Sequence, residues 1–241
     1  MSQNLLRNPA ETFLIVVSFF GLFLVIMLAY NPPTVQESFP LRRPTIGSIF
    51  GLLCVLGILA AFLPKQCSAI FEKKSGQPNA SNYAFHGTSS TMHGHHPDCE
   101  GFSAHVFRVK NRTFCTACTG LVLGGLIALA GTALYFFGDL HVEQNSLPVV
   151  WGGVLGVGFG LFQFKVKRSS VRLFLNTFFV LGAFLVLIGI DELAQSVFVD
   201  LFLVSLIVFW LFTRISLSQW DHKRICYICN RDTCKFRKSP G

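Results

Sequence analysis

Six long blocks of apolar residues are separated by polar segments along the chain, the longest of which follows the second block. At about 1.5 Å of rise per residue, a helix formed by each block would reach roughly 25–30 Å, enough to cross the hydrocarbon core of a bilayer. The pattern therefore predicts six transmembrane helices. They are expected over residues 12–30, 46–63, 120–138, 149–164, 171–190 and 197–215.

The composition agrees with a membrane protein and excludes an ordinary soluble domain. The mean hydropathy is +0.53, only 13% of the 241 residues are charged, and 26 are Phe. We expect the first block to be a helix and not a cleaved signal peptide, because it is long for such a peptide and lacks a small-residue cleavage pattern. The predicted fold class is an all-α membrane protein with about six transmembrane helices and a small cytoplasmic Cys/His metal-binding element.

The basic residues give the predicted orientation. The formal net charge is +8, and all but two of the 20 Lys and Arg residues fall in segments on one side of the six helices. Arg42 and Arg43 are the two exceptions. Because basic loops stay on the cytoplasmic side, both termini and the long loop after the second helix are expected in the cytoplasm. The same bias explains the positive charge, so nucleic acid is not an expected partner.

This pattern divides the chain into four segments. Residues 1–63 form a two-helix membrane segment, and residues 64–118 form a cytoplasmic linker and Cys/His metal loop. Residues 119–215 form a four-helix membrane segment, and residues 216–241 form a cytoplasmic, Cys-rich basic tail.

Glycines at intervals of four predict close helix packing, within a compact bundle or between copies or other membrane subunits. They are Gly152, Gly156 and Gly160, Gly120 with Gly124, and Gly47 with Gly51. Polar residues inside the predicted spans are few, which argues against an ion transporter. Asp191, Glu192 and Asp200 lie at span ends, where we expect them to be solvated at the outer membrane surface.

The candidate chemistry is concentrated before the third predicted helix. Cys99, His105, Cys115 and Cys118 supply three thiolates and one imidazole, which is the ligand set that tetrahedral zinc prefers. His96 either replaces one of these four ligands or forms a hydrogen bond to one of them. Since the Cys-x-x-Cys pair opens a helix, the partial positive charge of the helix start favours thiolates there.

This stretch resembles a family of polytopic prokaryotic membrane proteins grouped as a domain of unknown function. Cys115, Cys118 and Gly120 match its Cys-x-x-Cys-x-Gly element, and His96 and Cys99 match its upstream part loosely. The chain departs from the family at Ala117, where the family has arginine. The resemblance covers about 40 residues and implies a membrane protein with a cysteine-based site.

A second cluster, of His222, Cys226, Cys229 and Cys234, follows the last predicted helix. We expect these four residues to form a separate site of three thiolates and one imidazole. In the alternative arrangement, Cys226 and Cys229 join Cys115 and Cys118 in one four-cysteine site.

Three functions are compatible with these features. The first is a zinc-stabilised assembly or accessory subunit of a membrane complex, favoured by closed four-ligand sites. The second is a membrane-bound redox protein that uses an Fe–S centre or Cys-x-x-Cys thiols. The third is a metal transporter or sensor, which the scarcity of intramembrane polar residues disfavours. Whether the protein is an enzyme is left open by the sequence.

Overall fold

The structure is a computed structural model that describes residues 9–33, 40–62, 105–109, 112–138, 142 and 145–228. The side chains of residues 107–109, 112–113, 223 and 226–228 lie outside this description.

Six long helices and one β-hairpin make up the described fold. The helices are α1 (Pro9–Tyr30), α2 (Arg42–Phe62), α4 (Thr116–Phe137), α5 (Ser146–Leu161), α6 (Ser169–Ala194) and α7 (Val197–Ile228). The hairpin strands are β1 (Val106–Val109) and β2 (Arg112–Cys115), and a short 3₁₀ helix, η4 (Phe162–Lys165), follows α5. Within the described residues, six helices are long and apolar enough to cross a membrane, which agrees with the predicted number. Helix α7 continues well past the expected end at residue 215.

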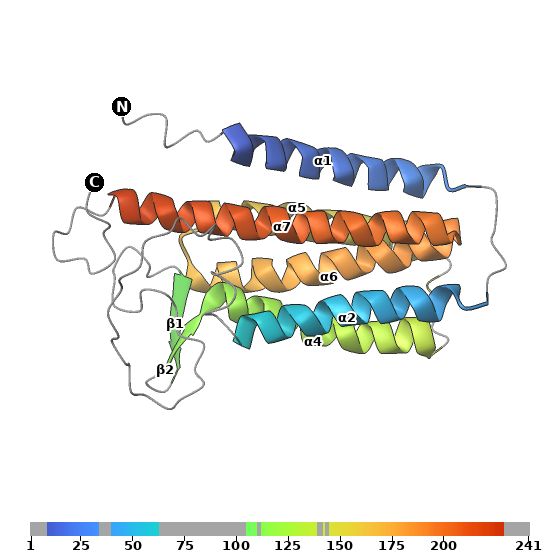
Figure 1. Ribbon diagram of the computed structural model, residues 1–241, viewed down its shortest axis with the longest axis horizontal. Coiled ribbons are helices and arrows are strands. Elements are labelled where there is room, and N and C mark those ends of the chain that lie inside the picture. The colour runs from blue at the N-terminus through green and yellow to red at the C-terminus, as the bar shows by residue number, and fades with distance from the viewer. Residues whose placement is uncertain are drawn as a thin grey trace, which may run out of the picture.

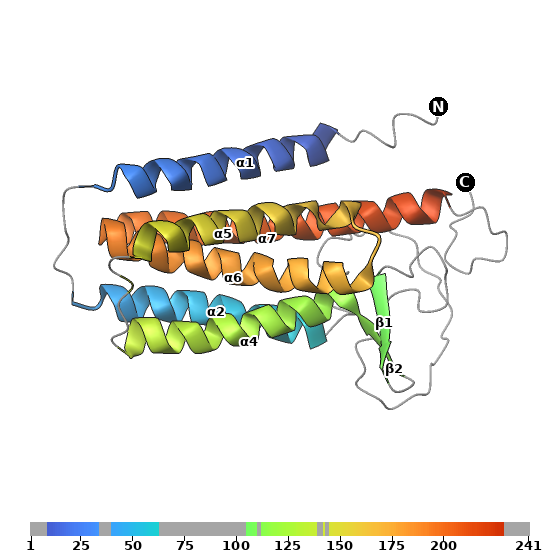
Figure 2. The ribbon, with the colours of Figure 1, turned by 180° about the vertical axis from the view of Figure 1, so that it is seen from behind.

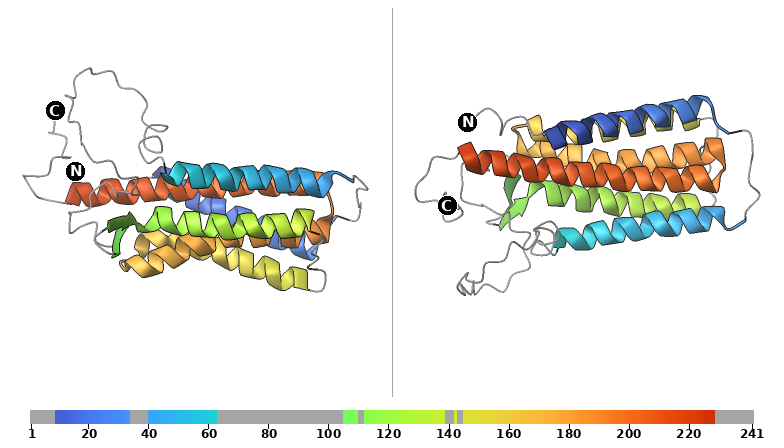
Figure 3. Two further views of the ribbon diagram at one scale, coloured as in Figure 1. Left: turned by 90° about the horizontal axis from the view of Figure 1, so that it is seen from below. Right: turned by 45° about the horizontal axis from the view of Figure 1, so that its top comes forward.

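The helices run alternately up and down (Figure 1). The starts of α1, α4 and α6 and the ends of α2, α5 and α7 lie at the end that carries the β-hairpin, which we call the hairpin end. The opposite end is called the far end. Figure 2 shows α1 along one edge of the bundle and α2 with α4 along the other. The last turns of α7 extend at the hairpin end (Figure 3).

Helix α6 forms the centre of the bundle. Its apolar window is the most buried of the six, and it packs most extensively against α5 and α4. Helix α1 is joined to α7 by polar contacts: Oγ of Ser18 donates to Oγ1 of Thr213 at 3.1 Å, and Nε1 of Trp210 donates to the Ser18 carbonyl at 3.2 Å. Such bonds satisfy polar groups that have no access to water inside the bundle.

The outward faces of α1 and α2 carry large apolar side chains that nothing in the described bundle covers. They include Phe13, Phe20, Phe23, Leu52, Leu56 and Leu59, each about half exposed or more. In water such a surface would drive association, whereas lipid tails solvate it. The exposed faces therefore fit a multi-pass membrane protein.

Glycine lets α5 and α6 approach until their backbones touch. A methyl group added at Gly153 would come within 2.7 Å of the Gly182 carbonyl oxygen, and one added at Gly182 would meet the Gly153 carbonyl at the same distance. Gly156 and Gly160 also face α6, as the spacing predicted. Gly152 takes no part in the close approach, because a methyl group there would meet only the Leu185 side chain of α6, at an ordinary contact distance of 3.9 Å. The contact stripe therefore begins at Gly153, one residue later than expected.

Candidate functional site

The β-hairpin positions the first thiol of the Cys-x-x-Cys pair. Its strands are antiparallel, and Cys115 at the end of β2 lies opposite Val106 at the start of β1. Cys115 has an extended backbone (φ −74°, ψ 118°) and directly precedes α4. The pair therefore spans the corner where a strand becomes a helix, with Cys118 in the first helical turn.

The two thiols contact each other at this corner. A hydrogen bond from Cys118 is the main cause that lowers the pKa of Cys115 to about 6. Burial opposes this shift, whereas the backbone N–H groups of Cys118 and Ala117 and the guanidinium of Arg214 favour it. Cys115 is therefore largely a thiolate at neutral pH, which is the form that binds metals or reacts as a nucleophile.

His105, which the sequence grouped with these thiols, faces α6 and α7. Nη1 of Arg172 lies 2.8 Å from each ring nitrogen of His105, and Nε2 of His222 lies 3.1 Å from Nδ1. Burial, followed by the charge of Arg172 and the nearness of His222, lowers the pKa of His105 to about 3. The imidazole is therefore neutral at pH 7.

Arg172 is the centre of this contact, and no sequence pattern singled it out. It is buried, and its Nη2 donates to Oδ2 of Asp221 at 2.8 Å. Its Nε donates to the Val166 carbonyl at 2.7 Å, just after η4. The ion pair thus joins α6, α7 and the turn between α5 and α6.

A second buried arginine, Arg214, lies between the Arg172 cluster and the two thiols. Arg214 donates through Nε to Oδ1 of Asn176 at 2.8 Å, and through Nη2 to the same oxygen. Nδ2 of Asn176 in turn donates to the Arg172 carbonyl at 2.6 Å. Asn176 is one of the few polar residues inside a predicted span. Its position is explained by its side-chain amide, which bridges two arginines at the hairpin end.

The predicted ligands are brought together only in part. Cys115 contacts Cys118, and His105 contacts His222, but no three His, Cys, Asp or Glu side chains form a metal-binding group among the described residues. The predicted ligands His96, Cys99, Cys229 and Cys234 lie outside the description, and Cys226 is described only as part of α7. The completed ligand set therefore stays a prediction.

The acids at the far end are buried, so the expectation that they are solvated is wrong. Asp191 and Asp200 have no exposed surface, and the Glu192 side chain is 9% exposed. Arg42 and Arg43, at the start of α2, bind them. The sequence contained one signal for this burial. Arg42 and Arg43 are the two basic residues predicted on the same side as these acids, so opposite charges were available to pair there.

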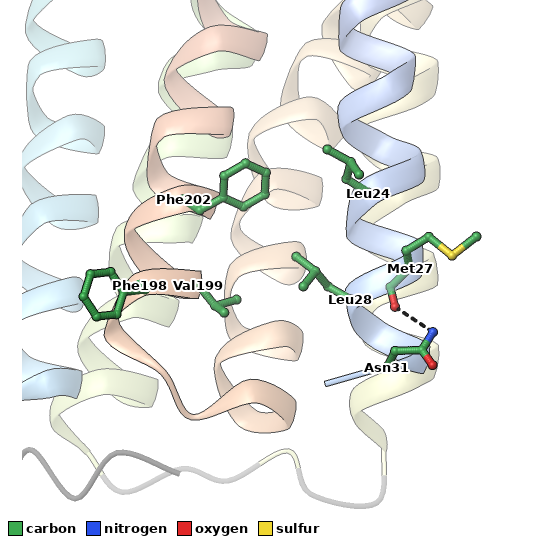
Figure 4. A pocket seen from close by; sticks show the side chains of 7 residues that line it. All are labelled: Leu24, Met27, Leu28, Asn31, Phe198, Val199 and Phe202. Carbon is green, nitrogen blue, oxygen red and sulfur yellow. Dashed lines mark hydrogen bonds between the residues drawn. The ribbon is translucent and has the colours of Figure 1, made fainter. Parts of the chain in front are cut away.

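The far end also carries an apolar groove between α1 and α7 (Figure 4). It is lined by Leu24, Met27, Leu28, Asn31, Phe198, Val199 and Phe202. Asn31 is the one polar residue of this lining, and its Nδ2 donates to the Met27 carbonyl at 3.3 Å. Because the groove opens at the far end, it is remote from Cys115 and Cys118.

No protein-family model, curated protein or solved structure matches the chain. Its function therefore has to be inferred from the geometry and chemistry of its own residues.

Proposed function

We propose that the protein is a multi-pass membrane protein that binds zinc on its cytoplasmic face through Cys115, Cys118, Cys99 and His96. In this proposal the metal folds a small platform on the helix bundle, and the platform serves assembly with other membrane subunits. The observation that carries the proposal is the hairpin register. Because Val106 is paired with Cys115, the chain that enters the hairpin starts beside the two thiols.

The spacing of the upstream ligands suits this register. Cys99 lies seven residues before Val106, a stretch that reaches at most about 24 Å when fully extended. His96-x-x-Cys99 and Cys115-x-x-Cys118 would then face each other across the base of the hairpin. Three thiolates and one imidazole complete a closed tetrahedral site, which is typical of structural zinc.

His96 is the preferred imidazole because His105 is already engaged. The ring of His105 lies against Arg172 and His222, and a cation bound there would face the guanidinium charge. Under this proposal His105 supports the platform by docking it on α6 and α7.

The tail cysteines are an extension of the same proposal. Helix α7 ends at the hairpin end and His222 contacts His105, and both observations support a position for Cys226 near the first cluster. Cys226, Cys229 and Cys234 would hold a second metal ion near the first, or Cys226 and Cys229 would share one ion with Cys115 and Cys118. The cytoplasmic orientation rests on the distribution of Lys and Arg.

A redox function is the second candidate, and the contact between Cys115 and Cys118 favours it. Two thiols in reach of each other at a helix start, one of them with its pKa lowered to about 6, are suited to thiol–disulfide exchange. Iron–sulfur ligation by the same cysteines is a further form of this function.

Metal analysis of the purified protein tests the proposal. We expect stoichiometric zinc in the wild type, loss of zinc in Cys115→Ser and Cys118→Ser, and retention in Cys54→Ser. Cys54 is the matched control, because it is a free cysteine buried in α2. His96→Asn should lose zinc and His105→Asn should keep it.

Other outcomes point to the second candidate. Iron with acid-labile sulfide would indicate an Fe–S centre. A metal-free protein in which Cys115 and Cys118 interconvert between dithiol and disulfide would replace the zinc proposal with thiol redox chemistry. A serine variant of either cysteine that keeps its full zinc content would remove the pair from the site.

A further inference from the structure

Four helices contribute to a buried polar network at the far end. Nη1 of Arg42 lies 2.5 Å from Oδ1 of Asp191 and 2.6 Å from Oδ2 of Asp200. Tyr135 of α4 joins from the other side, with its hydroxyl 2.8 Å from Oδ2 of Asp191 and 2.9 Å from Oε2 of Glu192. The tight turn between α6 and α7, in which Gln195 has a φ of 47°, brings Asp191 and Asp200 together.

The charges of this network do not balance. Arg42 and Arg43 supply two guanidinium groups, whereas Asp191, Glu192 and Asp200 supply three carboxyl groups. If all were ionised, one carboxylate would be buried without a countercharge from the described residues. An unpaired buried carboxylate is strongly unfavourable, and the usual solution is that the group takes up a proton.

One hydrogen-bond donor of the network is shared between two acids. The single proton of the Tyr135 hydroxyl faces carboxylate oxygens of both Asp191 and Glu192, and it can serve only one of them at a time. Oδ1 of Asp200 is buried and has no hydrogen-bond partner in the described part of the chain. A buried polar atom left without a partner requires an explanation, and a bound proton supplies one.

We infer that the Asp191–Asp200 carboxyl pair is a proton-binding site that holds one proton at neutral pH. Asp200 carries this proton, because Asp191 already accepts hydrogen bonds from both Arg42 and Tyr135. The two carboxyl groups are close enough to hydrogen-bond to each other, so the proton on Asp200 can be donated to Asp191. Binding converts one carboxylate to a carboxylic acid and needs no other reactant.

A proton fits this site better than a metal cation does. Nη1 of Arg42 is already in contact with both carboxyl groups, where a sodium or calcium ion would have to lie. Its positive charge would repel such an ion, whereas a proton leaves the guanidinium in place. Among the described residues, the titratable groups around the pair are Arg42 and Arg43 of α2, Tyr135 of α4 and Glu192 of α6; the other tyrosine at this end, Tyr30 of α1, is exposed beside Trp151.

The proton exchanges with the far side and not with the hairpin end. Between the two polar clusters, α6 and α7 bury apolar side chains, and these offer no relay for a proton. They include Val186, Leu187, Leu203 and Ile207. The site therefore senses the pH of one aqueous phase, the one beyond the far end.

Infrared spectroscopy of the wild type in an ester-free detergent tests the inference directly. We expect the C=O band of a protonated carboxyl group at pH 7, shifted on exchange into deuterium oxide. The band should disappear in Asp200→Asn and in Asp191→Asn, since each removes the excess negative charge. It should persist in Asp221→Asn, which is the matched control. Like Asp200, Asp221 is a buried aspartate of α7, but it is paired with Arg172.

Unfolding at different pH values gives a second readout. A proton bound only in the folded state makes the equilibrium constant of unfolding rise up to tenfold per pH unit between the ordinary carboxyl pKa of about 4 and the pH at which the folded site releases its proton. Asp200→Asn should lack this rise. A wild type without a protonated carboxyl band at pH 7 would overturn the inference, as would a band that survives in both asparagine variants. The wild-type spectrum decides the matter even if a variant does not fold.

Discussion

Arg172 and Asp221 form a buried ion pair between α6 and α7, with Nη2 of Arg172 2.8 Å from Oδ2 of Asp221. Their side chains are 9% and 8% exposed. The pair also places the guanidinium against His105, so it connects the hairpin to the membrane-spanning helices. Removing one partner is therefore expected to cost more than breaking an exposed ion pair, because the other charge would be left buried.

Asp221→Asn should destabilise the protein by about 3 kcal/mol, because it leaves the charge of Arg172 buried without its partner. The free energy of unfolding, measured by denaturant titration in detergent, checks this. Arg224→Ala is the matched control: Arg224 lies on the same helix but is exposed and makes a cation–π contact with Trp220, so we expect less than about 1 kcal/mol from it. Equal effects of the two variants would contradict a buried role for the pair.

Gly153→Ala should separate α5 from α6 and destabilise the bundle by about 1–3 kcal/mol, because the new methyl group would meet backbone atoms at 2.7 Å. Gly152→Ala, one residue earlier, adds the same methyl group where only the Leu185 side chain lies near, at 3.9 Å. Unfolding measured side by side should show a loss only at Gly153. A loss of similar size at Gly152 would mean that helix propensity or lipid contact, and not the interhelical approach, governs both positions.

Cys115 in protein stripped of metal should be alkylated by iodoacetamide with a midpoint near pH 6, well below the ordinary thiol value. Its lowered pKa means that the thiolate forms as the pH rises through about 6 and predominates at pH 7. Mass spectrometry of the labelled peptide gives the rate at each pH. Cys118→Ser should move the midpoint upward, since the hydrogen bond from Cys118 is the main cause of the shift. A midpoint near pH 9 in the wild type would contradict this environment.

Acid should weaken the hairpin end through His105. Its pKa is lowered to about 3 in the folded protein, whereas an unfolded histidine has a pKa of about 6.5. The unfolded chain therefore binds the extra proton between these values, and stability falls as the pH drops from about 6.5 toward 3, by at most about 1.4 kcal/mol per pH unit. His105→Gln should reduce this acid sensitivity. The slope of unfolding free energy between pH 6.5 and 5 checks it, and an unchanged slope in the variant would rule out His105 as its source.

The membrane fold could be read from the sequence because its signal is local. A run of some twenty apolar residues must form a helix in lipid, where each backbone polar group needs a partner within its own segment. The six predicted spans therefore agree with the structure to within a few residues at most ends. The end of α7 was missed because polar residues such as Ser218, Gln219 and Asp221 follow residue 215, although Asp221 is buried against other helices.

The candidate site was less accessible to sequence reasoning. The spacing of Cys115 and Cys118 marked the strand-to-helix corner, since two thiols so close in the chain must also be close in space. The partner of His105 could not be found in this way, because Arg172 and His222 come from helices far along the chain. The far-end acids were misjudged for a similar reason: their position at span ends suggested solvation, and only the packing of α2 against α4 and α7 buries them.

The sequence by itself determined the elements of this protein: six apolar helices, an uneven distribution of basic residues and a thiol pair at the start of a helix. Each of these depends on residues that are neighbours in the chain. Only the tertiary structure decided which buried charges meet, Arg172 with Asp221 at one end and Arg42 with Asp191 and Asp200 at the other. The physical reason is that ionisable groups inside a membrane protein are stabilised by partners from other helices, and the arrangement of the helices sets those partners.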